Sequence, residues 1–284
     1  MKEFVKQKDV SLTKPDKTIR VSYLWKPNAN DAKKVMLVLP GLDESISDYD
    51  NFFLELSSSL PEYSLLSIDL RGQGKTLEDE SRFQSLSITV EHQITIVKNL
   101  LNDFSIDSLF IIGLSYGAGV GLCLANQLDN VEGLALLAPY VSKFKNFNRG
   151  FSGVWYTLAH LNPFYKTLSY FSLPFYFQLA QARGRLNPAV KWDPRRMSAL
   201  TKLSTGIMRI STTKEARKLK GLSKGVHFLI GKKDDLVSIR AVEHLLKQIQ
   251  TEKKSLVIIP EGGHRLLIND YKECSNWISA IIKA

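Results

Sequence analysis

A serine flanked by glycines stands near the middle of the chain. The motif Gly-Leu-Ser-Tyr-Gly at 113–117 follows an apolar run at 109–112 and precedes a run of small and apolar residues. A strand, a sharp turn and a helix in this order would present the Ser115 hydroxyl as a nucleophile. Gly113 and Gly117 would let the strand and the helix approach closely, and the turn would strain the serine backbone. The motif therefore predicts covalent catalysis by Ser115.

Later in the chain are an acid and a base that could activate this serine. Asp234 follows an apolar run at 226–230, and His264 follows Pro-Glu-Gly-Gly after a second run at 255–259. Imidazole makes a serine hydroxyl nucleophilic by taking its proton, and a carboxylate orients the imidazole. Asp235 lies next to Asp234, so the residue types alone leave two candidates for the acid.

Alternating strands and helices must position these residues. We expect strands at 9–13, 18–27, 35–39, 63–70, 109–112, 131–137, 226–230 and 255–259. We expect helices over 52–60, 89–104, 196–220, 239–249 and 271–282, and one after the serine motif. The first two strands alternate polar and apolar residues, which is typical of an antiparallel hairpin. The rest predicts an α/β fold with a mostly parallel sheet, in which ligands bind beyond the carboxyl ends of the strands.

The stretch from 140 to 205 interrupts this alternation. It has no strand-like run, and thirteen Phe, Tyr and Trp residues lie between positions 144 and 192. The stretch contains ten basic residues and one acid, which gives it a net charge of +9 out of +10 for the whole chain. We interpret it as a folded, largely helical insertion, because structureless loops of that length are uncommon.

Taken together, the motifs resemble those of α/β-hydrolase-fold serine hydrolases, and are most similar to the lysophospholipase and monoacylglycerol-lipase branch. The matching segments are Pro40-Gly41-Leu42, Asp-Leu-Arg-Gly-Gln-Gly at 69–74, the motif at 113–117, the turn at 231–234 and Gly-Gly-His at 262–264. The resemblance implies an eight-stranded, mostly parallel sheet with helices on both faces. It also implies a core domain at 1–139 and 206–284, with 140–205 as a cap inserted over the site.

The resemblance also implies roles for individual residues. The family spacing selects Asp234 over Asp235 as the acid. The backbone amides of Leu42 and Tyr116 would form the oxyanion hole, and no metal or organic cofactor is implied. The family usually has histidine where this chain has Pro40, which leaves the shape of that loop open.

Other candidate groups have structural interpretations. His92, His160, His227 and His244 have no motif around them and are expected to be structural or surface groups, although His160 could contact substrate. The glycine-rich segment at 69–74 lacks the ending of a phosphate-binding loop and predicts a tight turn, with Asp69 and Arg71 bracing nearby loops. Cys123 and Cys274 predict two buried thiols rather than a disulfide framework or a metal site.

The composition of the chain indicates which cellular compartment and which binding partners to expect. No apolar run is long enough to span a membrane, and the N-terminus lacks the apolar core of a signal peptide, so we expect a cytoplasmic protein. The basic, aromatic segment indicates an anionic substrate or peripheral contact with an anionic membrane surface. Nucleic-acid binding is disfavoured, because no recognition motif accompanies the charge.

These observations favour a serine hydrolase that cleaves carboxylic esters with a lipophilic acyl group through an acyl-enzyme. A lysophospholipid or a monoacylglycerol would be such a substrate. A carbon–carbon bond hydrolase, an acyltransferase or a thioesterase would use the same three residues and stays open. A non-catalytic ligand-binding protein on this fold is the alternative from another class, although an intact Ser, Asp and His set argues against it.

Overall fold

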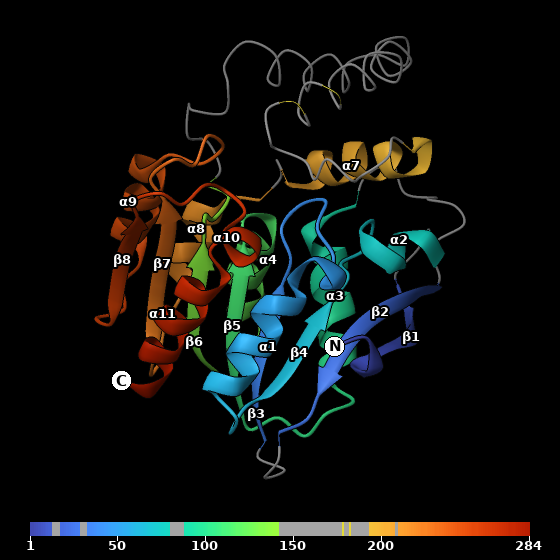
Figure 1. Ribbon diagram of the computed structural model, residues 1–284, viewed down its shortest axis with the longest axis horizontal. Helices are drawn as coiled ribbons and strands as arrows, with labels where there is room; N and C mark the ends of the chain where they lie inside the picture. Colours follow the sequence, from blue (N-terminus) through green and yellow to red (C-terminus); the bar gives the residue numbers. More distant parts are fainter. Residues whose placement is uncertain are drawn as a thin grey trace.

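The computed structural model describes residues 1–12, 18–28, 33–79, 88–141, 178, 182, 193–207 and 210–284. Its strands are β1 (Val5–Ser11), β2 (Thr18–Lys26), β3 (Lys34–Leu39), β4 (Ser64–Ile68), β5 (Ser108–Leu114), β6 (Val131–Leu137), β7 (Gly225–Gly231) and β8 (Lys254–Ile259). They form one sheet in the order β1-β2-β4-β3-β5-β6-β7-β8 (Figure 1). This confirms the predicted eight-stranded α/β fold.

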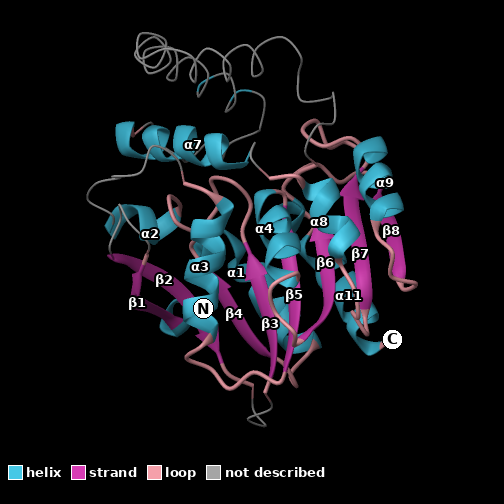
Figure 2. Ribbon diagram, turned by 180° about the vertical axis from the view of Figure 1, so that it is seen from behind, coloured by secondary structure: helices cyan, strands magenta, loops and turns pink. Residues whose placement is uncertain are grey.

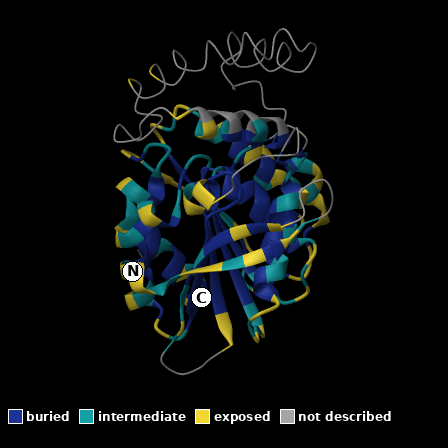
Figure 3. Cartoon of the chain, turned by 90° about the vertical axis from the view of Figure 1, so that its right-hand side faces the viewer, coloured by how far each residue is buried: buried dark blue, intermediate teal, exposed yellow. Residues whose placement is uncertain are grey.

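Pairing within the sheet follows the predicted pattern. β1 pairs antiparallel with β2, and β2 pairs antiparallel with β4. All pairs from β4 to β8 are parallel. The central strands are apolar along their length because both of their faces are buried (Figure 3).

Helices cover both faces of the sheet (Figure 2). The helical elements are η1 (Lys2–Phe4), η2 (Ile46–Tyr49), α1 (Asp50–Ser59), α2 (Gly74–Asp79), α3 (Val90–Leu101), α4 (Tyr116–Ala125), α7 (Pro194–Ile207), α8 (Thr212–Lys218), α9 (Ile239–Gln248), α10 (Leu266–Asn269) and α11 (Tyr271–Lys283). One apolar cluster contains buried side chains of α1, α10 and α11, and the other contains those of α3, α4, α8 and α9. The sheet is therefore the middle of three layers.

Some predicted boundaries are wrong. β1 begins at Val5 rather than at residue 9, because the polar residues Lys6 to Lys8 pair with β2 at the edge of the sheet. The single helix expected over 196–220 is two helices, α7 and α8, and the N-cap of α8 is Ser211 in a non-helical conformation. The short helix α2 was not expected after the turn at 69–74.

The predicted cap lies mostly outside the described residues, which include Arg195 and Arg196 among its basic residues but none of the thirteen aromatic residues between 144 and 192. Its last part is α7, which lies beyond the ends of the parallel strands in Figures 1 and 2. The expected boundary at residue 205 falls inside this helix.

Neither cysteine thiol takes part in a disulfide: both are free and buried, as the sequence predicts. Burial raises the pKa of Cys123 to about 12 and also raises the pKa of Cys274. Within the described ranges, no cluster of acidic, histidine and cysteine side chains has the geometry of a metal site. No helix among these residues is long and apolar enough to cross a membrane.

Candidate active site

Ser115 occupies a strained turn between β5 and α4. Its φ is 50° and its ψ is −106°, a region that residues with a side chain rarely adopt. The turn is anchored by its backbone, because the Ser115 N–H donates to Leu137 O at 2.9 Å and the Ser115 carbonyl accepts from Tyr140 N at 3.1 Å. These bonds leave the hydroxyl free of any anchoring role.

The two glycines of the motif are required by close approach. A Cβ atom at Gly113 would lie 2.6 Å from the backbone of Ala118. A Cβ atom at Gly117 would lie 2.1 Å from the carbonyl oxygen of Leu39, at the end of β3. The start of α4 therefore packs directly on the backbone where β3 ends and the segment 40–42 begins.

The structure places the candidate base and acid in line with the serine. His264 Nε2 lies 3.0 Å from Ser115 Oγ, and His264 Nδ1 lies 2.8 Å from Asp234 Oδ2. The Asp234 side chain is fully buried, and 16% of the His264 side chain is exposed. This series can pass a proton from the serine hydroxyl to the imidazole while the carboxylate faces the other ring nitrogen.

The loops that carry Asp234 and His264 are joined to each other. Lys232 N donates to Ile259 O at 2.8 Å, and Lys233 N donates to Gly262 O at 2.9 Å. A Cβ atom at Gly231 would lie 2.2 Å from the carbonyl oxygen of Gly262, so the contact needs glycine. The strands β7 and β8 thus fix the distance between the carboxylate and the imidazole.

Asp234 and Asp235 differ sharply in their surroundings. Asp234 Oδ1 accepts hydrogen bonds from the backbone amides of Leu236 and Val237, each at 2.8 Å. Its second oxygen is left for His264. Asp235 is exposed. The side chain that meets the imidazole is therefore the one selected by the family spacing.

Two backbone amides are available near the serine. Tyr116 is the first residue of α4, so its N–H has no partner within the helix, and Leu42 follows the Leu39–Pro40 backbone on which Gly117 packs. Among the described residues, neither amide has a hydrogen-bond acceptor. The Tyr116 side chain is buried, so this residue can serve the site only through its backbone.

The segment at 69–74 braces neighbouring loops. Asp69 Oδ1 accepts from Ile46 N at 2.7 Å and Oδ2 accepts from Lys75 N at 2.9 Å, and burial raises the pKa of Asp69 to about 6. The Arg71 amide donates to the Gln93 side chain at 2.9 Å. These contacts agree with the predicted bracing role and with a turn rather than a phosphate site.

The remaining histidines do not join this series in the part of the chain that is described. His92 Nδ1 faces Thr89 N at the start of α3. His227 Nδ1 lies 2.8 Å from Ser255 Oγ, and its Nε2 lies 2.7 Å from Lys224 O. His244 lies on α9, and His160 falls outside the described residues.

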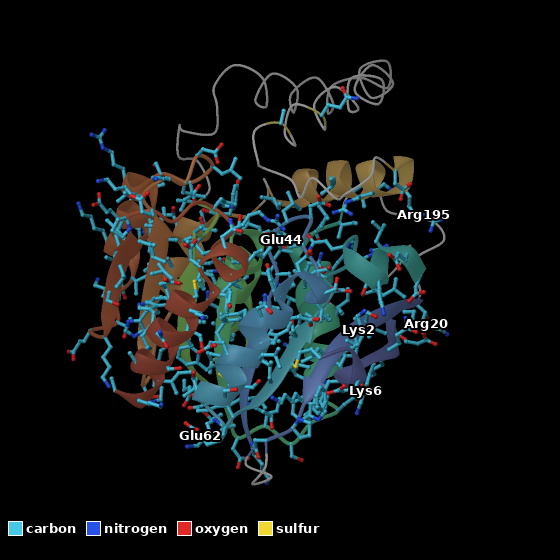
Figure 4. The ribbon with its side chains drawn as sticks, viewed as in Figure 1. Lys2, Lys6, Arg20, Glu44, Glu62 and Arg195 are labelled. Atoms are coloured by element: carbon cyan, nitrogen blue, oxygen red, sulfur yellow. The ribbon has the colours of Figure 1, made fainter. Side chains whose placement is uncertain are left out.

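Sequence reasoning missed three side chains around the segment 41–44, which leads to the Leu42 amide. The Gln73 side chain forms hydrogen bonds with the backbone of Gly41 and Asp43. The Glu44 carboxylate forms an ion pair with Arg265, the residue after His264. Figure 4 places Glu44 among the loops at this end of the molecule. Two sequence signals could have drawn attention to them: Gln73 lies within the matching segment 69–74, and Arg265 directly follows His264.

Comparison with known families gives a match over most of the chain. The model of the family described as serine aminopeptidase, S33 matches residues 30–271. No curated protein sequence matches the chain.

Solved structures share the fold over almost the whole chain. A thermophilic esterase from Thermogutta terrifontis is 16% identical with a TM-score of 0.70, and the match covers 98% of each chain. The α/β hydrolase MGS-M2 from a Medee basin deep-sea metagenome library is 20% identical with a TM-score of 0.69, again over 98% of each chain. A membrane phospholipase A, described as a bacterial virulence factor, is 17% identical with a TM-score of 0.66, over 99% of this chain and 86% of that one.

Proposed function

Because the chain belongs to the serine aminopeptidase S33 family of α/β-hydrolase-fold serine hydrolases, we propose that it cleaves carboxylic esters with a lipophilic acyl group. The observation that carries the proposal is the hydrogen-bonded series of Ser115, His264 and Asp234 at the ends of β5, β8 and β7. Ser115 is the nucleophile, His264 the general base and Asp234 the residue that orients the imidazole.

The reaction follows from these positions. His264 Nε2 takes the Ser115 proton as Oγ attacks the ester carbonyl, and Asp234 stabilises the imidazolium through Nδ1–H. The amides of Leu42 and Tyr116 donate to the oxyanion that forms. His264 then protonates the leaving alcohol, the acyl group stays on Ser115, and a water activated by His264 releases the acid.

An ester is preferred over an amide as the substrate on two grounds. The similar structures include an esterase and a phospholipase A, although the family description names a peptidase. The thirteen aromatic residues between positions 144 and 192 suit an apolar acyl chain better than a free amino terminus. We assign residues 140–205 to a cap that lines the acyl pocket.

A labelling and substrate series tests this function. Treatment with a fluorophosphonate should place the adduct on Ser115, as located by mass spectrometry of peptides. Among p-nitrophenyl acetate, butyrate, octanoate and palmitate, kcat/KM should be higher for the longer acyl groups than for acetate. An aminoacyl p-nitroanilide should be a poor substrate. No adduct on folded protein would overturn the hydrolase, and preference for the anilide would overturn the ester.

The same three residues could serve an acyltransferase or a thioesterase, and acyl-acceptor competition separates these activities. Adding an alcohol or a thiol acceptor to the ester assay should leave the free acid as the main product if water is the acceptor. A dominant transfer product would replace hydrolysis by acyl transfer while keeping the roles of the three residues.

The positive charge of the cap also supports contact with an anionic surface. Each basic residue near an anionic membrane contributes about 1 kcal/mol, within a Debye length of about 10 Å. In the structure Arg196 Nε lies 2.6 Å from Asp43 Oδ1, and Arg195 Nη1 lies 3.2 Å from Glu78 O, so these two arginines also contact the core.

We therefore expect sedimentation with liposomes to increase with anionic lipid and to fall at high salt. Changing Arg183, Arg185, Arg195 and Arg196 together to glutamine should weaken binding. A variant with only Arg183 and Arg185 changed keeps the contacts of Arg195 and Arg196 with the core. Weaker liposome binding by this variant would therefore be due to lost membrane contact and not to lost core contacts. Binding that responds neither to salt nor to these changes would leave the cap as a pocket wall only.

A further inference from the structure

The segment 41–44 is held by hydrogen bonds on nearly every backbone group. Gly41 N donates to Tyr49 Oη at 3.1 Å, and Gly41 O accepts from Glu44 N at 3.3 Å. Asp43 N donates to Gln73 Oε1 at 3.1 Å. Of the four amides in the segment, only that of Leu42 has no acceptor among the described residues. The bonding thus isolates one N–H group as a free donor.

Gln73 makes the most extensive contact with this segment. Its Nε2 donates to Gly41 O at 3.1 Å and to Glu44 O at 3.2 Å, while its Oε1 accepts from Asp43 N. The residue is 2% exposed, so water cannot reach these groups, and loss of the side chain would leave buried backbone groups without hydrogen bonds. One side chain therefore fixes the backbone on both sides of Leu42.

Arg265 holds the same segment from the opposite loop. Its Nε lies 3.0 Å from Glu44 Oε1, and the second oxygen of Glu44 accepts from the Tyr49 hydroxyl. Only 17% of the Arg265 side chain and 8% of the Glu44 side chain are exposed. Since Arg265 follows His264, this ion pair joins the segment with the free amide to the loop with the imidazole.

The segment needs such restraint for two reasons. Asp43 has a φ of 65°, a conformation that residues other than glycine adopt at an energetic cost. A cavity of about 620 Å³ adjoins the segment, lined in part by Asp43, Gln73 and Arg265. Without these hydrogen bonds and the ion pair, relief of the strain at Asp43 would favour movement of the segment, and the cavity would leave space for it.

We propose that Gln73 and Arg265 are positioning residues that hold the Leu42 amide in the oxyanion hole, Gln73 directly and Arg265 through Glu44. The inference rests on the proposed serine hydrolase function. An oxyanion donor acts only when it is already aligned with the charge that develops in the transition state. Loss of alignment should therefore lower kcat and leave KM almost unchanged, because the substrate still binds.

The chain provides a matched control for each residue. Asn130 also bonds a loop backbone through its side-chain amide, with its Nδ2 donating to Ile106 O at 2.9 Å ahead of β5 and β6. Lys233 also forms an ion pair between loops at the same end of the sheet, with Glu261, but both side chains are exposed. Neither control contacts the segment 41–44.

The experiment compares Gln73→Met with Asn130→Leu, and Arg265→Gln with Lys233→Gln, in ester hydrolysis, fluorophosphonate labelling and thermal unfolding. Gln73→Met should lower kcat by about 10- to 100-fold, less than the loss of about 10²- to 10³-fold typical when an oxyanion donor is removed. Its labelling rate should fall in parallel, while Asn130→Leu should retain the kcat and the labelling rate of the parent. Arg265→Gln should lower kcat by a smaller factor, Arg265→Lys should restore most of it, and Lys233→Gln should match the parent.

The outcomes separate this inference from the proposed function. If the parent is neither labelled nor active, the hydrolase itself is wrong. If the parent is active and Gln73→Met loses no more kcat than Asn130→Leu at a similar Tm, or changes KM alone, the positioning role is wrong. If Gln73→Met does not fold, the Arg265 and Lys233 variants decide the question, and equal kcat in those two overturns the role.

Discussion

Replacing Ser115 by alanine should abolish ester hydrolysis, with a fall in kcat on the order of 10⁶-fold, the loss seen when the nucleophile of such a triad is removed. The side chain makes no bond that holds the turn, since the anchoring contacts to Leu137 and Tyr140 belong to the backbone. The variant should therefore keep the Tm of the parent. Steady-state hydrolysis of a p-nitrophenyl ester and thermal unfolding measure the two quantities.

Ser47→Ala is the matched control for this prediction. Ser47 is exposed, follows β3 as the segment 41–44 does, and has its hydroxyl 2.9 Å from that of Ser45. This variant should hydrolyse the ester and take up the fluorophosphonate like the parent. Substantial activity in Ser115→Ala would mean that another residue carries the acyl group.

Asp234→Asn should lower kcat by about 10³- to 10⁴-fold, as loss of the orienting carboxylate does in related triads. The structure explains why asparagine is a poor substitute. Leu236 and Val237 donate to one side-chain oxygen, so an amide would keep its oxygen there and turn its NH₂ toward His264. Two donors would then compete at Nδ1, and the imidazole would adopt the tautomer that protonates Nε2 and can no longer accept the serine proton.

Asp235→Asn is the control for the same measurement. Its side chain is exposed and its change removes the same charge from the same turn, so kcat should stay close to that of the parent. The opposite ranking of the two variants would move the acid to Asp235.

Much of the fold could be predicted because its central strands are buried on both faces. Apolar runs at 35–39, 131–137 and 226–230 coincide with β3, β6 and β7 to within a residue at either end. The errors fall where that signal is weak. β1 is an edge strand with polar residues, and a helical pattern cannot show that two helices, α7 and α8, form in place of one.

Some residues of the candidate site could also be predicted from the sequence, and others could not. Ser115, Asp234 and His264 stand in short motifs that directly follow strands, so their meeting at one end of the sheet could be inferred from the order of elements. The choice between Asp234 and Asp235 came from family spacing rather than from local pattern. Gln73 and Arg265 act through partners 29 to 32 and 221 positions away, and no local pattern encodes such contacts.

The distance along the chain between the joined groups has a consequence for biosynthesis. Ser115 and His264 are 149 positions apart, and Glu44 and Arg265 are 221 positions apart. A growing chain can complete the serine turn long before the ribosome releases β8, and loop closure over such spans comes late in folding. Under the proposed mechanism, a nascent or truncated chain that lacks His264 has no base to activate Ser115. We therefore expect reactivity of Ser115 only after β8 has docked and has brought His264 to the serine turn.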